Sequence, residues 1–183
     1  RQLDALKRLG LPIYHDAPRQ LEDIARSIER LGVLAGSEGA ARTFADDYRQ
    51  RLAALRRQHA EQAPVTVFHQ VWTKPLMTVN GQHLISDVIR LCGGRNLFDD
   101  EALMVPQPTL EAVISRDPEV ITTAGTPDQP ADFSLWRAWP RLKAVQRQQL
   151  VALPGDLISR HSPRILEGAA LMCEALAQAR QRR

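Results

Sequence analysis

Cysteine is scarce in this chain of 183 residues. Its two cysteines, Cys92 and Cys173, lie far apart, which excludes the close pairs of a CxxC redox motif and of common zinc sites. Two interpretations remain open at this point. The cysteines are either two buried free thiols or one structural disulfide, and a disulfide would indicate an oxidising compartment.

The sequence also lacks the motifs of several enzyme classes. Its five histidines show no HExxH or HxH spacing, so a metal site has no support. There is no GxSxG nucleophile motif, no P-loop and no GxGxxG. The glycine-rich run at 92–96 follows a helical pattern instead of opening one, so it cannot hold a phosphate at a helix N-terminus. Catalysis has no positive signal, and no cofactor is expected.

Long apolar runs and a strong charge of one sign are absent as well. No run approaches the roughly 20 apolar residues that span a bilayer. The net charge of +3 is too small and too evenly spread to indicate nucleic-acid binding. With 44% hydrophobic and 25% charged residues, the composition is that of an ordinary globular protein. The chain begins without Met inside a helix-like pattern, and we expect residues to precede it.

The first part of the chain contains helical patterns and one short extended run. The spacing predicts a helix over 1–9, a strand over 11–14 and a long helix over 37–62. Between the strand and the long helix, Leu21, Ile24, Ile28 and Leu31 recur at helical spacing, which predicts a helix that Gly32 ends. The long helix has Phe44 and Tyr48 on one face and arginines on the other, and it is long enough to join two lobes. A partner-binding coiled coil is the alternative, but the heptads are few.

From residue 64 onward, strands and helices alternate. The pattern predicts a strand from Val65 to Trp72, an extended segment at 75–79, helices at 83–91 and 109–115, a strand at 120–123, a short helical piece around Trp136, a buried strand at 150–153 and a last helix at 163–177. This alternation predicts one complete α/β lobe with parallel strands.

The stretch 149–171 carries the first candidate binding residues. Asp156 and Arg160 follow the strand at 150–153 after a Pro-Gly turn. A carboxylate and a guanidinium at the carboxyl end of a strand lie where open α/β sheets bind ligands. The alternative is an ordinary surface ion pair at i, i+4, which contributes only a few tenths of a kcal/mol.

Aromatic and acidic residues near other element ends are further candidates. Trp72, Trp136 and Trp139 lie near predicted strand ends, where each is either a packing residue or a platform for a bulky organic ligand. Glu111 stands in the first turn of a predicted helix, where the helix dipole favours a carboxylate. Its functional alternative is an exposed acidic contact for a basic partner.

Several ordered motifs carry a resemblance to a known family. They are LCGGRNLF at 91–98, VPQPTLEAVISRDPEVITTAGTPDQ at 105–129, LPGDLISRHSPRI at 153–165 and LMCEAL at 171–176. Together with the long helix, they resemble the periplasmic solute-binding proteins of ABC importers that have a rigid connecting helix. The Asp156–Arg160 pair before SPR, with both cysteines in register, resembles the members that bind cobalamin.

The resemblance implies a role for each candidate residue. Asp156 and Arg160 would hydrogen-bond the amide periphery of a corrinoid, and Trp136 and Trp72 would lie against it. Glu111 would dock onto an arginine pocket of the membrane permease. Cys92 and Cys173 would form a disulfide within the C-terminal lobe.

The resemblance also implies the organisation of the protein. The expected fold is α/β, with two Rossmann-like lobes joined by one long helix. Residues 1–35 would be the remnant of an incomplete N-terminal lobe, 36–63 the interlobe helix and 64–183 the C-terminal lobe. The expected protein is periplasmic, is not an enzyme, and is a monomer when intact. The exposed sheet edges of an incomplete lobe would favour association.

Three alternatives stay open. A haem or ferric-siderophore binder of the same superfamily would need an iron ligand such as Tyr14, Tyr48 or His69. An enzyme or metal-binding domain of nitrogenase-like α/β type would need clustered cysteines or histidines, which two distant cysteines do not provide. An interaction module would use the arginine-rich long helix.

Overall fold

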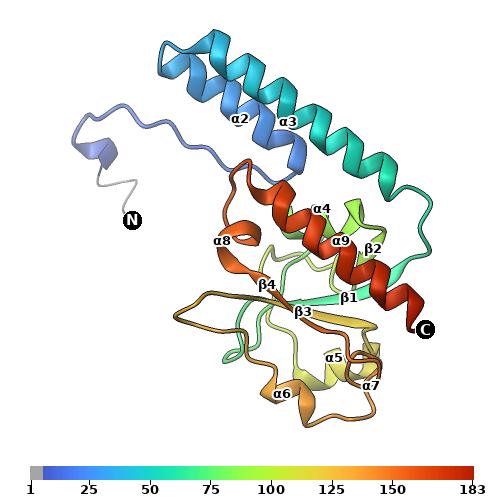
Figure 1. Cartoon of the computed structure of the whole chain (residues 1–183). Coiled ribbons are helices and arrows are strands. Elements are labelled where there is room, and N and C mark those ends of the chain that lie inside the picture. The colour runs from blue at the N-terminus through green and yellow to red at the C-terminus, as the bar shows by residue number, and fades with distance from the viewer. Residues whose placement is uncertain (1–5) are drawn as a thin grey trace.

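A parallel β-sheet forms the centre of the molecule. The computed structural model describes residues 6–183. Its four strands are β1 (Val65–Gln70), β2 (Gly94–Asn96), β3 (Val120–Gly125) and β4 (Leu150–Pro154), in the order β2-β1-β3-β4 (Figure 1). Strands β1 and β3 are rich in β-branched residues, which fit a pleated buried surface. The α/β class predicted from the sequence is confirmed.

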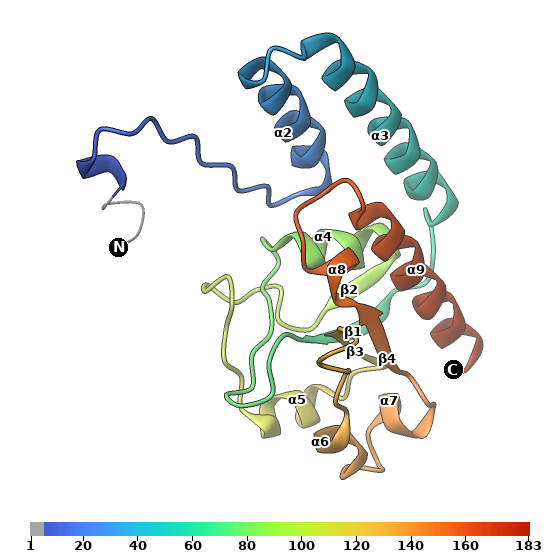
Figure 2. The same cartoon turned by 60° about the vertical axis from the view of Figure 1, so that its left-hand side comes forward.

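Helices cover both faces of the sheet. One face carries α4 (Leu84–Leu91), α8 (Gly155–Ile158) and α9 (Ile165–Gln181), and the other carries α5 (Leu110–Arg116), α6 (Ser134–Arg137) and α7 (Lys143–Gln146), as Figure 2 shows. Successive side chains of β1 point to opposite faces. Val67 therefore packs in the α4–α9 cluster, and Phe68 packs in the α5–α7 cluster.

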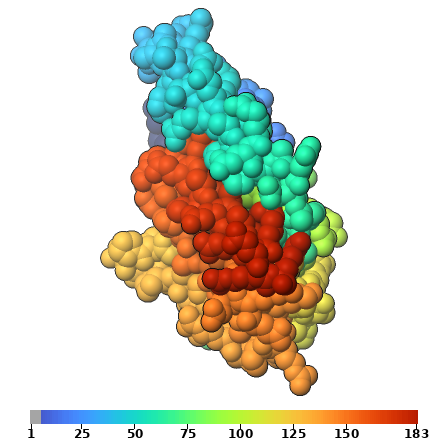
Figure 3. Space-filling model, turned by 45° about the vertical axis from the view of Figure 1, so that its right-hand side comes forward, coloured from blue at the N-terminus to red at the C-terminus, as the bar shows by residue number. Residues whose placement is uncertain are grey.

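A helical hairpin precedes the sheet. Helices α2 (Leu21–Leu34) and α3 (Glu38–Gln58) lie antiparallel, and the hairpin projects from the body beyond α9 (Figure 3). The Tyr48 hydroxyl donates to the Leu21 carbonyl at 2.9 Å, and Arg49 makes two hydrogen bonds to Glu29 at 2.7 and 2.9 Å. Such a bidentate pair fixes geometry as well as adding energy.

The N-terminal predictions need correction. Residues 11–14 form no strand, and Leu11 and Tyr14 are 52% and 45% exposed. An apolar run becomes a strand only where a partner strand is available, and no strand of the described residues lies beside it. The predicted helix over 1–9 falls largely on residues 1–5, which lie outside the described residues.

Gly32 does not end α2, which continues to Leu34. A Cβ atom at Gly32 would lie 2.2 Å from the Ala41 Cβ, so glycine is needed here for close packing of α2 on α3. Leu31 and Phe44, which belong to the apolar faces predicted for these two helices, are each 50% exposed. Helix α3 ends at Gln58, four residues before the predicted end, and Glu61 then adopts a positive φ of 60°.

Three short elements of the C-terminal part were not predicted. Strand β2 has only three residues, and α7 and α8 have four each, so none shows a measurable hydrophobic period. The strand at 150–153 is β4, but Leu153 alone is buried there, because β4 is an edge strand. The predicted boundaries at residues 35 and 63 stay a prediction.

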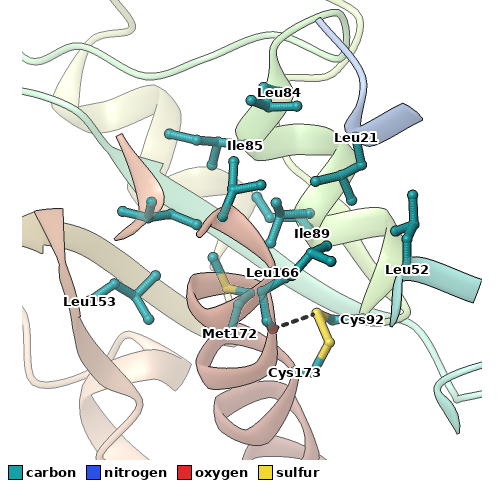
Figure 4. Close-up of a cluster of buried hydrophobic side chains, with 14 of the residues drawn as sticks. Leu21, Leu52, Leu84, Ile85, Ile89, Cys92, Leu153, Leu166, Met172 and Cys173 are labelled. Carbon is teal, nitrogen blue, oxygen red and sulfur yellow. Dashed lines mark hydrogen bonds between the residues drawn. A yellow bond between two sulfur atoms is a disulfide. The ribbon is translucent and has the colours of Figure 1, made fainter. Parts of the chain in front are cut away.

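A disulfide joins the two helices that cover one face of the sheet. Cys92, directly after α4, is bonded to Cys173 of α9, beside Ile89, Leu166 and Met172 (Figure 4). This confirms the pairing that the resemblance implied. Both cysteines are almost fully buried.

The Cys92→Ala/Cys173→Ala variant is expected to lose stability. The bridge closes a loop with a sequence separation of 81, and the chain-entropy model gives such a loop roughly 4–5 kcal/mol. Urea denaturation measures this loss, and reduced wild type serves as the control. A double variant within about 1 kcal/mol of the oxidised wild type would contradict the prediction.

Candidate ligand-binding edge

All four strands end at the same edge of the sheet because all pair in parallel. Four segments follow these ends: 71–83 after β1, 97–109 after β2, 126–133 after β3 and 155–164 after β4. We call this edge, with its four segments, the carboxyl edge. Open α/β sheets bind ligands outside it.

One position on the carboxyl edge is distinguished by topology. The chain leaves β1 for α4 on one face of the sheet and leaves β3 for α6 on the opposite face. Strands β1 and β3 are neighbours. The segments after them therefore diverge, and such a switch point is where a crevice for a ligand forms.

Asp156 and Arg160 lie on the carboxyl edge, as predicted. Asp156 is in α8 and Arg160 follows it, and both side chains are exposed. The ion pair of Asp156 recorded in the structure is with Arg164, at 3.3 Å. The alternative interpretation, a surface pair between Asp156 and Arg160, therefore lacks support among the described residues.

Trp72 also lies on the carboxyl edge, in a tight turn over residues 71–77. The Val71 N–H donates to the Met77 carbonyl at 2.9 Å, and the Met77 N–H donates to the Trp72 carbonyl at 3.0 Å. The indole N–H of Trp72 donates to the Lys74 carbonyl at 3.0 Å. The side chain is thus held at one end, while the residue stays 56% exposed.

Trp136 does not have the predicted placement. It is 0% exposed, and its ring packs edge-on against Phe68 with a centroid distance of 5.3 Å. Its indole N–H donates to the Gln70 Oε1 at 2.6 Å. No face of the ring is open to a ligand, so this structure does not support the predicted direct contact of Trp136. Trp139 is 40% exposed, near the amino ends of β3 and β4, beside Asp117 and Leu142.

Glu111 lies in the first turn of α5, where its side chain is exposed. The Thr109 hydroxyl accepts a hydrogen bond from the Ala112 N–H at 3.2 Å and so caps the helix. Because α5 follows the segment after β2, Glu111 stands beside the carboxyl edge. Its docking role stays a prediction.

A row of buried polar residues under the switch point was missed in the sequence. His69 and Gln70 end β1, and Thr122 and Thr123 lie opposite them in β3. The His69 Nδ1 is hydrogen-bonded to the Thr122 Oγ1 at 2.9 Å, and the Thr123 hydroxyl donates to the Gln70 carbonyl at 2.9 Å. The available signal was the polar ending of two apolar strands, VTVFHQ and VITTAG.

A pair of histidines links two parts of the carboxyl edge. The His83 Nδ1 accepts from the Ile85 N–H at 3.2 Å and caps α4, and its ring lies 6.2 Å from that of His161. Burial, and then the proximity of His161, lower the pKa of His83.

Within residues 6–183 there is no group of three or more histidine, cysteine, aspartate or glutamate side chains suited to a metal ion. Over the same residues, no helix is both long and apolar enough to cross a membrane.

Neutral His69 is expected to make stability depend on pH. Burial is the main cause that lowers the pKa of His69 from 6.5 to about 3. Between these values the unfolded chain binds a proton that the folded chain does not. The contribution of neutral His69 to the free energy of unfolding is therefore fully present above pH 6.5. It is lost as the pH falls toward 3, by about 1.4 kcal/mol per pH unit.

Urea denaturation between pH 5 and 7 checks this dependence. In His69→Gln, the slope of the unfolding free energy against pH is expected to fall by about 1.4 kcal/mol per pH unit, which is the contribution of one proton. His15→Gln is the matched control, since His15 is exposed. An unchanged slope in His69→Gln would show that the buried imidazole does not cause the dependence.

Comparison with known proteins defines the class. Residues 4–157 match the family described as periplasmic binding protein, and the chain belongs to this family. The chain is 37% identical over 177 residues to the vitamin B12-binding protein of Vibrio cholerae serotype O1, covering 96% of this chain and 63% of that protein. The corresponding protein of Yersinia pestis is 36% identical over 178 residues, with 97% and 61% covered. The chain thus spans less than two thirds of the length of these relatives.

Solved structures support the same class. The periplasmic vitamin B12 binding protein BtuF of Vibrio cholerae superimposes with a TM-score of 0.88 at 36% identity, covering 98% of this chain and 70% of that one. The periplasmic heme-binding protein RhuT from Roseiflexus gives a TM-score of 0.78 at 18% identity, covering 97% and 71%. The second likeness is one of fold alone.

Proposed function

We propose that this protein captures a corrinoid as the solute-binding protein of an ABC importer and delivers it to the membrane permease, without catalysing a reaction. The observation that carries the proposal is the exposure of Asp156 and Arg160 on the same edge as the exposed ring of Trp72. The similarity to vitamin B12-binding proteins supports the choice of ligand.

The chemistry of these side chains suits a corrinoid. Its rim carries amide groups, which both donate and accept hydrogen bonds, and its faces are broad and largely apolar. Asp156 offers carboxylate acceptors and Arg160 offers guanidinium donors. Trp72 offers an apolar ring. A few fixed polar groups beside an aromatic surface are the usual composition of a site for a large organic molecule.

Haem is less well supported by the residues present. Tyr48 is buried between α2 and α3 and donates to Leu21, Tyr14 lies in the extended segment before α2, and His69 is buried against Thr122. None of these presents an exposed iron ligand on the carboxyl edge. A hemin titration with a shift of the Soret band would favour haem instead.

Asp156→Ala/Arg160→Ala is expected to weaken cyanocobalamin binding. Hydrogen bonds to charged groups contribute about 1.5–3 kcal/mol, so each substitution should cost roughly 10- to 100-fold in affinity. Isothermal titration calorimetry measures this in the 183-residue chain. It is repeated in what we call the extended protein, which is this chain joined to the part of the Vibrio cholerae relative that it does not cover.

Glu174→Gln is the matched control, because Glu174 is exposed on α9, away from the carboxyl edge. If the double variant and wild type of the extended protein bind cyanocobalamin equally well, Asp156 and Arg160 are not part of the binding site. If the extended wild type does not bind cyanocobalamin, the proposed corrinoid ligand is wrong.

We also propose that Glu111 docks onto a basic pocket of the permease in the periplasm. Its exposure in the first turn of α5 supports this role, since an arginine can approach the carboxylate without unfolding any element.

Glu111→Gln is expected to reduce association with the permease at least roughly 10-fold, because a charged hydrogen bond is lost, while cyanocobalamin affinity stays unchanged. Association with the permease reconstituted in nanodiscs measures this, with Glu174→Gln again as the control. Full association of Glu111→Gln would place the docking surface elsewhere.

A further inference from the structure

Gln70 occupies the last position of the central strand β1, under the switch point, and its side chain is enclosed. The residue is 2% exposed. Its Oε1 accepts from the indole N–H of Trp136 at 2.6 Å. Its Nε2 donates to the Thr73 hydroxyl at 3.2 Å and to the Asp132 carbonyl at 3.4 Å. Both ends of the amide are therefore engaged.

These partners belong to the two segments that diverge at the switch point. Thr73 is in the 71–77 turn, which carries Trp72. Asp132 is in the 126–133 segment, which follows β3 and leads into α6. The amide of Gln70 is thus a direct link between the segments that diverge at the switch point.

The segment after β3 is itself ordered at this point. The Asp132 carboxylate accepts from the Ser134 N–H at 2.8 Å and from the Ser134 hydroxyl at 3.0 Å. The Asp132 carbonyl that faces Gln70 therefore has a defined position. The Gln70 backbone is fixed as well, because its carbonyl accepts from the Thr123 hydroxyl.

Burial makes this link stiff. A buried donor or acceptor that loses its partner leaves its desolvation uncompensated, so separating the two segments is unfavourable. Trp136 reinforces the link from below, since its ring is packed against Phe68 and its N–H leaves the Gln70 amide little freedom to rotate.

We propose that Gln70 is the positioning residue of the ligand site, that its amide holds the Trp72-bearing turn and the 126–133 segment at a fixed separation, and that Trp136 acts on the ligand only through Gln70. The inference rests on the proposed function of the carboxyl edge. It also replaces the direct ligand contact of Trp136 expected from the sequence.

Hydrogen exchange tests the link without any ligand. In Gln70→Met, the amides of 71–77 and 126–133 are expected to exchange at least about 10-fold faster, which corresponds to about 1.4 kcal/mol, while peptides of α9 and β4 keep wild-type rates. A general loss of stability would instead raise exchange throughout the sheet.

Gln149→Met is the matched control. Gln149 is also 2% exposed, but it directly precedes β4 and so lies at the amino-terminal ends of the strands, away from the carboxyl edge. This variant removes a buried glutamine amide that makes no contact with 71–77 or 126–133 and is expected to leave the exchange rates of 71–77 unchanged. Unchanged exchange of 71–77 in Gln70→Met would overturn the proposal.

Cyanocobalamin titration of the extended protein tests the role of Trp136. Trp136→Phe and Gln70→Met are each expected to lower affinity about 10-fold, and the combined variant is expected to be no weaker than Gln70→Met. If the ring of Trp136 instead touched the ligand directly, Trp136→Phe would lose less affinity, because phenylalanine keeps an aromatic face. Its loss of affinity would also add to that of Gln70→Met.

Failure of this inference and failure of the proposed function are distinguishable. If wild type binds cyanocobalamin and Gln70→Met binds equally well, the positioning role is wrong and the function stands. If the extended wild type takes up no cyanocobalamin, the function is wrong and this inference is overturned with it.

Discussion

The parallel pairing of β1 between β2 and β3 determines where the candidate side chains of this protein lie. Trp72 and Asp156 are distant in sequence, yet parallel pairing brings the ends of their strands to one edge. An antiparallel neighbour would send one of them to the opposite edge. The chain leaves β1 and β3 toward opposite faces of the sheet, so the segments that follow them diverge, as at the ligand sites of open α/β sheets. The candidate site is thus a consequence of strand order before any side chain contributes.

Local patterns explain which elements could be predicted. Helix α5 has its cap Thr109 and its buried Val113 within a few residues, and α4 has a strongly one-sided apolar pattern, so both were predicted nearly to their ends. The strand predicted at 11–14 is wrong because its formation does not depend on local pattern alone. Whether an apolar run becomes a strand depends on a neighbour that is remote in sequence. Strand β2 was missed because three residues are too few to show a period of two.

The candidate site was predictable in position more than in detail. Asp156, Arg160 and Trp72 follow strand ends, and strand ends can be found from sequence. The burial of Trp136 could not be found in this way, because its α6 helix has only four residues and shows no period. The difference between an exposed Trp72 and a buried Trp136 arises from tertiary contacts with Phe68 and Gln70.

The α2–α3 hairpin is joined to the body by the buried Leu21 and Leu52, by a hydrogen bond from the Leu21 N–H to Asp87 at 2.8 Å, and by the last turn of α9. The Arg180 guanidinium donates to the carbonyls of Ala63, Cys92 and Gly93 at 2.8, 2.7 and 3.1 Å. One side chain therefore ties the connection between α3 and β1 to the end of α4, next to the disulfide. These three hydrogen bonds hold the connection between α3 and β1 against the body formed by α4, α9 and the sheet.

The buried and exposed polar residues of the carboxyl edge have different physical tasks. Asp156, Arg160 and Trp72 are exposed, so their side chains can contact a ligand, but little packing around them holds them in place. Gln70 is buried and fully hydrogen-bonded, so it touches no solvent yet fixes the segments around it. A binding site loses affinity when its segments must be ordered during binding. A buried amide that orders them in advance lowers this cost, which explains why a polar side chain occupies the end of the central strand where an apolar one would pack more simply.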